Sequence, residues 1–333
     1  MGNVISLGQI VVDTTLRVPN VPVAGEDIFA SSSSQLVGGG YNLLHAVRQM
    51  GQQACFAGLL GTGPNAALIR KTLKDEGIKH IGATRLDCDN GFSIALTDNQ
   101  AERTFISVRG AEAEGDPEAF DQVDPEPADV VYLSGYTLVH RTAQALLQFL
   151  QSHPDPRRFT TIFDASPVFG QAEDKAVVRA LVDYSPIWSC NLREAPIIAW
   201  KIGMEWSNDT DGGEDGDPEA YLRLSQALGS TLIVHVGPHG AWLCQDDQAR
   251  HIPGFPVIPV DTNGAGDCHT GVLCALLSKG VPLSDAISYA NAAAALSVTK
   301  AGPATCPTPQ EIQDFTNTNM TSAWQSGNEH HTT

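Results

Sequence analysis

Short apolar runs alternate with segments of helical spacing along most of the chain. Where leucine, isoleucine and valine recur every three or four residues and a glycine follows, the pattern predicts helices, at 42–50 and 66–76, with an alanine-rich one at 286–298. Short apolar strands are expected at 4–7, 54–60, 130–133, 161–163, 186–189 and 232–236. Such alternation predicts an α/β protein with a mainly parallel sheet covered on both faces.

Two regions interrupt this alternation. Residues 14–36 are polar and contain proline, with room for short extended pieces. Residues 92–96 and 104–108 alternate in polarity and are joined by a polar turn, which predicts a hairpin. Together they indicate a small accessory sheet formed from two insertions.

Three polar segments are expected to lie outside this framework. Residues 111–129 are acidic and contain proline, and residues 207–218 are rich in glycine and aspartate, so both are predicted to be solvated loops. A calcium-loop interpretation of the second fails because Ala220 stands where the bidentate glutamate should be. The chain is expected to be one domain over 1–316, followed by a disordered tail over 317–333.

Composition narrows the classes of function. The 333 residues are 42% hydrophobic and 17% charged, which suits a globular protein with a sizeable core. The net charge of −18 argues against binding to nucleic acid or to anionic membranes, although a nucleotide needs only a local site. No apolar run approaches the ~20 residues of a membrane span. Seven scattered cysteines and no signal-like N-terminus lead us to expect a cytoplasmic protein without zinc or disulfides.

The segment 257–271 carries the clearest chemical signal. Its first four residues are apolar and predict a buried strand, and an apolar helical pattern begins at Val272. Between them lies a turn of three small residues, Gly264, Ala265 and Gly266. A small-residue turn that opens a helix directs free backbone N–H groups at one point, where the helix dipole adds positive potential. The segment therefore predicts an anion site, most naturally for phosphate.

Asp267 lies in the first turn of that predicted helix. A carboxylate beside an anion site repels the anion and so requires another purpose. Taking a proton from a hydroxyl that attacks phosphorus is the economical one. The alternative is an ordinary aspartate that complements the helix dipole.

The whole string from Asp261 to Asp267, Asp-Thr-Asn-Gly-Ala-Gly-Asp, resembles the signature of the ribokinase-like (PfkB) family of sugar and nucleoside kinases. The resemblance implies a three-layer αβα sandwich with a mainly parallel sheet and a small β-sheet lid, here from about 14–36 and 91–108. It makes Gly264, Ala265 and Gly266 an anion hole and Asp267 the catalytic base. It also implies ATP and Mg²⁺, with K⁺ beside Asp261 in many relatives.

Two motifs are candidates for holding the acceptor substrate. Asn42 follows a run of three glycines at a helix start, and its amide can both donate to and accept from sugar hydroxyls. Asp13 follows the first strand, where a carboxylate points into the ligand crevice of an α/β sheet. A capping Asn42 and a turn Asp13 remain the structural alternatives. The resemblance adds Gly38 and Gly39, and lid side chains Phe92 and Phe105, although Val37 and Leu44 depart from the family pattern.

Further motifs resemble the family's nucleotide side. Asn191 and Glu194 match its Asn-x-x-Glu motif, which organises Mg²⁺ partly through water, while the alternative is a helix start with a capping box. The turn at 235–240 matches a Thr-x-Gly-x-x-Gly pattern through Gly237 and Gly240, with His235 in place of threonine. Asn291 matches a position near the adenine.

A glycine-rich turn at 61–66 resembles a dinucleotide fingerprint but does not lie in the first βαβ unit. In the kinase family this turn carries an aspartate where Gly63 stands here.

The sequence as a whole predicts an ATP-dependent kinase acting on a hydroxymethyl group of a sugar or nucleoside, with a homodimer through the lid as a further expectation. The alternatives are a kinase of the same fold for a vitamin precursor and a catalytically silent binding module.

Overall fold

A computed structural model describes residues 2–100, 103–206 and 216–328. Its centre is a nine-stranded sheet in the order β13-β12-β11-β10-β9-β8-β1-β4-β5. Neighbouring strands are parallel from β5 to β11. β12 pairs antiparallel with β11, and β13 pairs antiparallel with β12. The strands are β1 (Val4–Ser6), β4 (Ala54–Phe56), β5 (Lys79–His80), β8 (Val130–Ser134), β9 (Thr160–Asp164), β10 (Ile187–Asn191), β11 (Leu232–His235), β12 (Gly240–Gln245) and β13 (Gln248–Pro253). The predicted mainly parallel sheet is confirmed.

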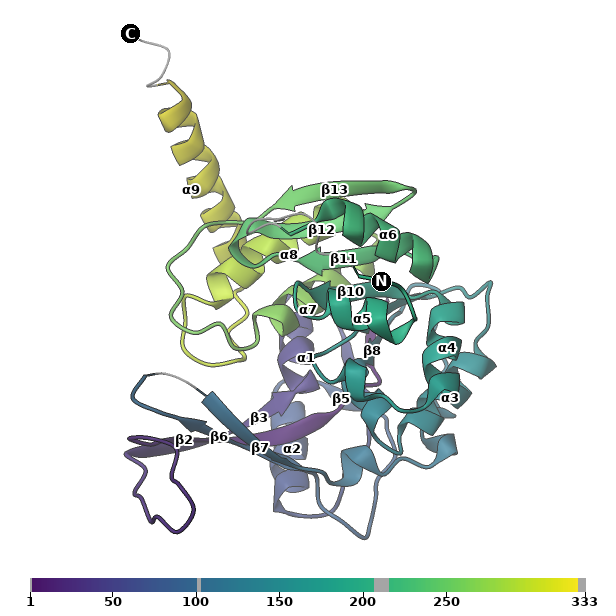
Figure 1. The fold of residues 1–333 in the computed structure, drawn as a ribbon, viewed down its shortest axis with the longest axis vertical. Helices are drawn as coiled ribbons and strands as arrows, with labels where there is room; N and C mark the ends of the chain where they lie inside the picture. Colours follow the sequence, from purple (N-terminus) through teal and green to yellow (C-terminus); the bar gives the residue numbers. More distant parts are fainter. Residues whose placement is uncertain (1, 101–102, 207–215, 329–333) are drawn as a thin grey trace.

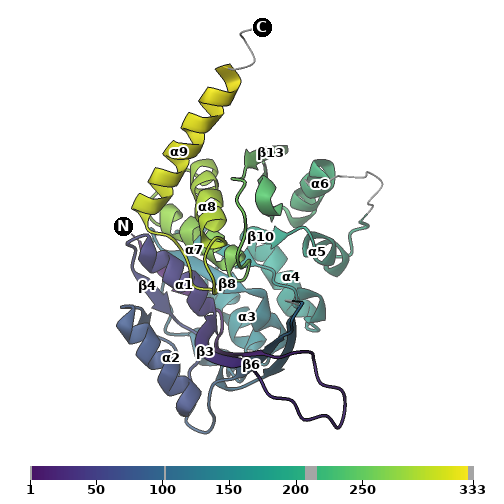
Figure 2. The same cartoon turned by 90° about the vertical axis from the view of Figure 1, so that its left-hand side faces the viewer.

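Helices cover both faces of this sheet (Figures 1 and 2). Because successive side chains of a strand point to opposite faces, Val4 enters one core and Ile5 the other. The first core contains α1 (Gly40–Gln49), α2 (Pro64–Asp75), α7 (Ala265–Leu277) and α8 (Leu283–Ser297). The second contains α3 (Ala143–Ser152), α4 (Lys175–Tyr184), α5 (Ala195–Lys201) and α6 (Pro218–Leu228). This is the expected three-layer αβα sandwich.

A separate four-stranded sheet projects from the body, in the order β3-β2-β6-β7 (Figure 1). Its strands are β2 (Ile10–Arg17), β3 (Ser32–Gly39), β6 (Phe92–Thr97) and β7 (Arg103–Val108). β6 and β7 pair antiparallel, as the predicted hairpin requires, and the first insertion supplies β2 and β3. This second sheet is the small lid that the sequence predicts.

Two local predictions were wrong. Residues 257–260 form no strand, and Ile258 and Val260 are exposed. Prolines at 256 and 259 remove backbone donors, so this apolar run cannot sustain a ladder. Residues 111–129 are not a fully solvated loop, since two short 3₁₀ helices, Ala111–Ala113 and Pro117–Phe120, bury Phe120 and Glu112.

The last described element of the chain is a helix. α9 (Pro309–Asn328) continues through residues 317–328, whereas 329–333 lie outside the described residues. Its start is a reciprocal cap: Thr308 N–H donates to Glu311 Oε2 at 2.7 Å, and Glu311 N–H donates to Thr308 Oγ1 at 3.3 Å. The second predicted loop spans residues 207–218, and its residues 207–215 also lie outside the described part of the chain. Within the described residues, no helix is long and apolar enough to cross a bilayer.

Candidate active site

The catalytic candidate Asp267 lies in the first turn of α7, as predicted. The helix begins at Ala265, seven residues before Val272, where the apolar pattern that predicts it starts. Gly264 precedes it with a φ of 77°, and a Cβ there would lie 2.1 Å from the carbonyl oxygen of Pro303. Only glycine fits this left-handed, crowded position, so the turn that aims the N–H groups depends on it.

Asn42 brings α1 to the same point. Its side-chain Nδ2 donates a hydrogen bond to Asp267 Oδ2 over 3.0 Å, across 225 residues of sequence. Asn42 is 6% exposed, and its Oδ1 is buried without a hydrogen-bond partner. The amide therefore orients the carboxylate and retains one acceptor that a ligand hydroxyl could satisfy.

Asp13 lies on β2 of the lid, next to β3. A Cβ at Gly38 would lie 1.9 Å from Asp13 Oδ2, so the glycine leaves the space that this carboxylate occupies. Burial raises the pKa of Asp13 to about 6. Burial also raises the pKa of Asp267 to about 6; the bond from Asn42 lowers that pKa, and the charge of Asp13 raises it. The effect of the Asp13 charge on Asp267 indicates that the two carboxylates lie in the same region of the molecule.

Asp164 is a further acidic residue that the sequence analysis did not select. It ends β9 and accepts a hydrogen bond from Ser166 N–H at 3.1 Å. Burial, and then the charges of Glu194 and Asp267, raise its pKa to about 8. A carboxylate at the carboxyl end of the strand Thr-Thr-Ile-Phe-Asp was the available signal.

Comparison with known proteins gives this geometry its context. The model of the pfkB family of carbohydrate kinases matches residues 1–311. The chain is 31% identical to an uncharacterized sugar kinase, YegV, from Escherichia coli K12, over 93% of this chain and 92% of that protein. It is 24% identical to a ribokinase of Bacillus subtilis, covering 95% and 99%. A crystal structure of a Thermotoga maritima ribokinase shares the fold with a TM-score of 0.76 and 22% identity, covering 95% and 100%.

The chain belongs to the pfkB carbohydrate kinase family. Such kinases transfer phosphate to an alcohol, and the combination of αβα body and lid agrees with that assignment. The remaining predicted residues can now be located within this kinase.

Asn191 and Glu194 form the local cap that was the alternative interpretation. Asn191 Oδ1 accepts hydrogen bonds from the N–H groups of Arg193 and Glu194, at 2.8 and 3.1 Å, and Glu194 Oε2 accepts from Asn191 N–H at 2.9 Å. Burial raises the pKa of Glu194, whereas its hydrogen bonds with Asn191 lower it. The cap uses one carboxylate oxygen and fixes Glu194 at the carboxyl edge of the sheet, beside Asp164.

The residues predicted on the nucleotide side have internal partners. His235 ends β11, where its Nε2 lies 2.8 Å from Ser189 Oγ. Its ring is 4.3 Å from that of His269, edge to face. Asn291 is buried, with Nδ2 donating to the carbonyl oxygens of Ile252 and Pro253. Neither Ser189 nor His269 was selected from sequence, because only the fold brings these four elements together.

Gly237 and Gly240 flank the turn that follows β11, at the edge where His235 lies.

Asp261 connects two loops: its Oδ1 accepts from Asn263 N–H at 3.0 Å and its Oδ2 from Gly302 N–H at 3.2 Å. The carboxylate therefore fixes the loop that leads into Gly264. A role beside a monovalent cation stays a prediction.

The two lid aromatics lie on opposite faces. Asp13 pairs with Ser93 and Val12 with Phe92, so Phe92 points away from Asp13 and packs on the main core. Its predicted substrate contact is not supported by this register. Phe105 pairs with Ala95, on the face of Asp13, and is 59% exposed.

The turn at 61–66 does not provide a second nucleotide site. Asp89 occupies the start of α2, where its carboxylate accepts hydrogen bonds from the N–H groups of Asn65 and Ala66 at 3.0 and 2.8 Å. A Cβ at Gly63 would lie 2.2 Å from the Asp89 carboxyl carbon. Asp89 thus supplies from another segment the carboxylate that the family pattern expects at Gly63.

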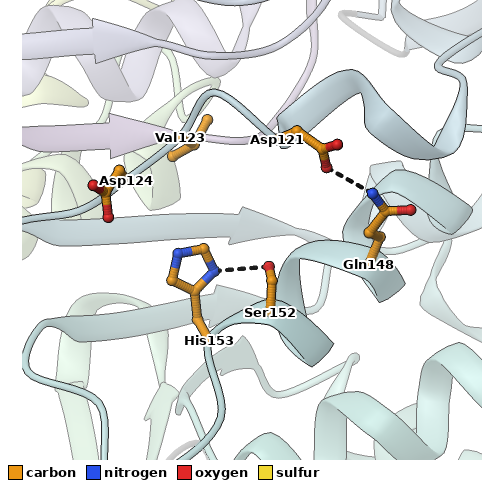
Figure 3. A pocket seen from close by; sticks show the side chains of 6 residues that line it. All are labelled: Asp121, Val123, Asp124, Gln148, Ser152 and His153. Atoms are coloured by element: carbon orange, nitrogen blue, oxygen red, sulfur yellow. Dashed lines mark hydrogen bonds between the residues drawn. The ribbon is translucent and has the colours of Figure 1, made fainter.

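A hollow between α3 and the segment after Phe120 is a separate feature, lined by Asp121, Val123, Asp124, Gln148, Ser152 and His153 (Figure 3). Gln148 donates to Asp121 at 2.7 Å, and His153 hydrogen-bonds with Ser152 at 3.1 Å. None of the predicted site residues borders it, so it is not the candidate active site.

Proposed function

We propose that this kinase transfers the γ-phosphoryl group of ATP to a hydroxymethyl group of a sugar or nucleoside. The observation that carries the proposal is the Asp267 carboxylate at the start of α7, which accepts a hydrogen bond from Asn42 and whose pKa the charge of Asp13 on the lid raises. These three groups come from three elements remote in sequence. A merely structural capping aspartate would not require a buried amide from another helix to bond to it.

Asp267 acts as the general base. Its Oδ1 or Oδ2 takes the proton of the substrate hydroxyl as that oxygen bonds to the γ-phosphorus, and the bond from phosphorus to the β,γ-bridging oxygen breaks, releasing ADP. With a pKa of about 6, Asp267 is ionised at neutral pH yet closer to the pKa range of an effective base than an exposed aspartate.

The start of α7 stabilises the transferring phosphoryl group. The N–H groups of Gly264, Ala265 and Gly266 precede or begin the helix and lack partners within it. The Ala265 N–H makes one long hydrogen bond, 3.4 Å, to the carbonyl oxygen of Thr262, and all three groups would donate to phosphoryl oxygens of the bound nucleotide. Gly266 has open space where a Cβ would be, which leaves room for a ligand at the backbone.

Mg²⁺ would neutralise charge on the nucleotide phosphates. Glu194 and Asp164 offer the hard oxygen donors that Mg²⁺ prefers, and the Asn191 cap engages only Oε2 of Glu194. The described residues contain no group of three or more ligand side chains arranged around a metal. A metal held mainly by phosphates and water, with Glu194 nearby, fits this donor set.

Asp13, Gly38, Gly39 and Asn42 would hold the acceptor. A carboxylate and an amide with a free acceptor suit a polyol better than the single hydroxymethyl group of a vitamin precursor. Solved structures of the same fold include an Arabidopsis thaliana ribokinase with ribose and ATP and a Burkholderia thailandensis nucleoside kinase with inosine. They support the class of substrate without choosing within it.

The lid could also join two copies of the chain. β7 is an edge strand, and Phe105, Ile106 and Val108 on it are exposed. A homodimer through this edge would cover them. Sedimentation velocity of the purified chain and of Ile106→Lys tests this: a dimer that the substitution dissociates supports it, and a wild-type monomer contradicts it.

ATP consumption with Mg²⁺ against a panel of pentoses, ketohexoses, sugar phosphates and nucleosides tests the main proposal. We expect turnover on at least one compound that is lost in Asp267→Asn. Nucleotide binding without turnover on any compound would favour the silent-module alternative.

A further inference from the structure

The β6–β7 hairpin of the lid leaves and re-enters the body beside a buried glutamate. β6 begins directly after Gly91, and β7 ends two residues before Gly110. Glu112 lies in the short 3₁₀ helix that follows and is 3% exposed. A carboxylate is costly to bury unless polar partners satisfy it, and the proposed mechanism gives this one no task.

Each oxygen of the Glu112 carboxylate accepts a hydrogen bond from one of the two connecting segments. Oε2 accepts from Gly91 N–H and Oε1 from Gly110 N–H, both at 2.8 Å. Asn90 Nδ2 adds a longer bond to Oε2, at 3.3 Å. Hydrogen bonds from backbone N–H groups to a carboxylate are charge-assisted and stronger than neutral ones. This arrangement, the Glu112 clamp, ties the entrance of the hairpin to its exit.

Glycine is required on both sides of the clamp. A Cβ at Gly91 would lie 2.3 Å from Glu112 Oε1 and 2.3 Å from the carbonyl oxygen of Val108. A Cβ at Gly110 would lie 2.3 Å from the Gly91 nitrogen. Because neither segment carries a side chain here, the two backbones pass close enough for one carboxylate to reach both.

The backbone of Glu112 fixes the clamp to the body. Its carbonyl oxygen accepts from Thr142 Oγ1 at 2.9 Å, directly before α3. Thr142 is 2% exposed, and its Oγ1 also accepts from Gly115 N–H at 2.9 Å. Because α3 belongs to the second core, the carboxylate holds the lid from a packed base.

The clamp connects to Asp13 through a single residue. The Gly91 carbonyl oxygen accepts from Val12 N–H at 3.2 Å. Asp13 is the next residue of β2, and it pairs with Ser93 of β6. Gly91 therefore donates to the Glu112 carboxylate with its N–H and holds, with its carbonyl oxygen, the backbone that carries Asp13.

We propose that Glu112 is a positioning residue for the acceptor substrate, because its clamp on the lid sets the place of Asp13 relative to Asp267 on the body. Glu112 does not touch the substrate and acts through Gly91. A glutamate that only stabilised the fold would lower the free energy of unfolding when replaced and leave acceptor binding unchanged. This inference rests on the proposed function, since it assumes that Asp13 holds the acceptor.

Glu112→Gln opens the clamp with little change of volume. An amide has one acceptor oxygen, so its NH₂ group faces one of the two glycine N–H groups without a bond. We expect the KM for the acceptor to rise roughly tenfold, while ADP affinity measured by calorimetry stays the same. An unchanged acceptor KM, or an equal loss of ADP affinity, would overturn the proposal.

Asp129→Asn is the matched control for the loss of a buried carboxylate. Asp129 is also 3% exposed, and it accepts from the N–H groups of Asn3 and Glu126 at 2.6 and 2.9 Å. It directly precedes β8, at the amino end of the strand, whereas the candidate site lies at the carboxyl ends. The acceptor KM should not change in Asp129→Asn, and a rise equal to that of Glu112→Gln would contradict a specific role of Glu112.

A double-mutant cycle tests whether Glu112 acts through Asp13. Asp13→Asn removes the carboxylate that Glu112 is proposed to place. Glu112→Gln should therefore lower kcat/KM for the acceptor much less in Asp13→Asn than in the wild type. Equal factors in the two backgrounds would show that Glu112 does not act through Asp13.

Amide hydrogen exchange provides a readout that does not depend on activity. In free wild-type protein labelled with nitrogen-15 glycine, Gly91 and Gly110 should exchange slowly. At least one of them should exchange roughly tenfold faster in Glu112→Gln. Fast exchange of both glycines in the wild type would refute the clamp.

Wild-type protein that turns over no acceptor would instead contradict the proposed function. Wild-type turnover with an acceptor KM that Glu112→Gln leaves unchanged would contradict only this inference. Thermal unfolding of each variant identifies loss of fold, and in that case the exchange of the two glycines in the wild type decides whether the clamp exists.

Discussion

Asn42 Nδ2 donates a hydrogen bond to Asp267 Oδ2 at 3.0 Å, which joins a predicted substrate residue to the predicted base. The bond favours the ionised carboxylate and so lowers the pKa of Asp267, against the effects of burial and of Asp13. In the proposed mechanism Asn42 would therefore have two tasks: it would orient the base and favour its ionised form, and its unpartnered Oδ1 would accept from the substrate.

Asn42→Ala should raise the pKa of Asp267, because the bond that stabilises the charged form is lost. We expect the acid limb of the kcat/KM profile to move to higher pH. Asn90→Ala is a matched control, since Asn90 is equally buried but bonds to Gly61 and the Glu112 region instead. An acid limb that stays in place in Asn42→Ala, or moves as far in Asn90→Ala, would contradict this role.

Asp267→Asn should stabilise the fold at neutral pH. The folded-state pKa of about 6 exceeds the ordinary aspartate value of 3.8, so ionised Asp267 costs stability once the pH rises through this interval. The gain in the free energy of unfolding should be about 1–3 kcal/mol above pH 6 and vanish below about pH 4. Denaturant unfolding at pH 4 and pH 8 measures it, and a variant less stable than wild type at pH 8 would argue against a desolvated carboxylate.

Gly38→Ala should impair substrate binding through Asp13. The added Cβ would lie 1.9 Å from Asp13 Oδ2, so the carboxylate must move. We expect the KM for the acceptor to rise at least tenfold while ADP affinity stays the same. Gly170→Ala is the control, since its Cβ would meet only side-chain atoms, Ile197 Cγ2 at 3.0 Å and Trp200 Cζ3 at 4.0 Å. An unchanged acceptor KM in Gly38→Ala would remove Asp13 and Gly38 from the substrate site.

Glu194→Gln should increase the Mg²⁺ concentration needed for half-maximal rate. Glutamine can still accept from Asn191 N–H, so the cap is preserved while the charge is lost. Titration of the rate with Mg²⁺ at saturating ATP provides the measurement. A superimposable titration curve would show that Glu194 is a structural cap and no more.

A site feature could be predicted from the sequence where all of its residues lie in one short segment. The turn at Gly264 and the first-turn position of Asp267 follow from small residues before an apolar helix, and the structure has both. The strand expected at 257–260 was wrong because apolar character was weighed above Pro259 within it and Pro256 directly before it.

Contacts between side chains from distant segments could not be predicted from the sequence. Asp89 supplies a carboxylate at Gly63 from 26 residues away, and His269 meets Asn291 and His235 only after three elements have packed. Phe92 and Phe105 looked alike in sequence, and the register of β6 and β7 alone puts them on opposite faces. A one-residue offset in a strand changes the face, and a pattern without the pairing partner does not determine it.

The most direct test of the central claim is the turnover of Asp267→Asn, with ATP, Mg²⁺ and the acceptor that the wild type uses. Loss of a general base typically costs ~10²–10⁴ in rate, so we expect kcat to fall at least a hundredfold while ADP affinity changes little. A variant that keeps near-full turnover would contradict the assignment of Asp267 as the base.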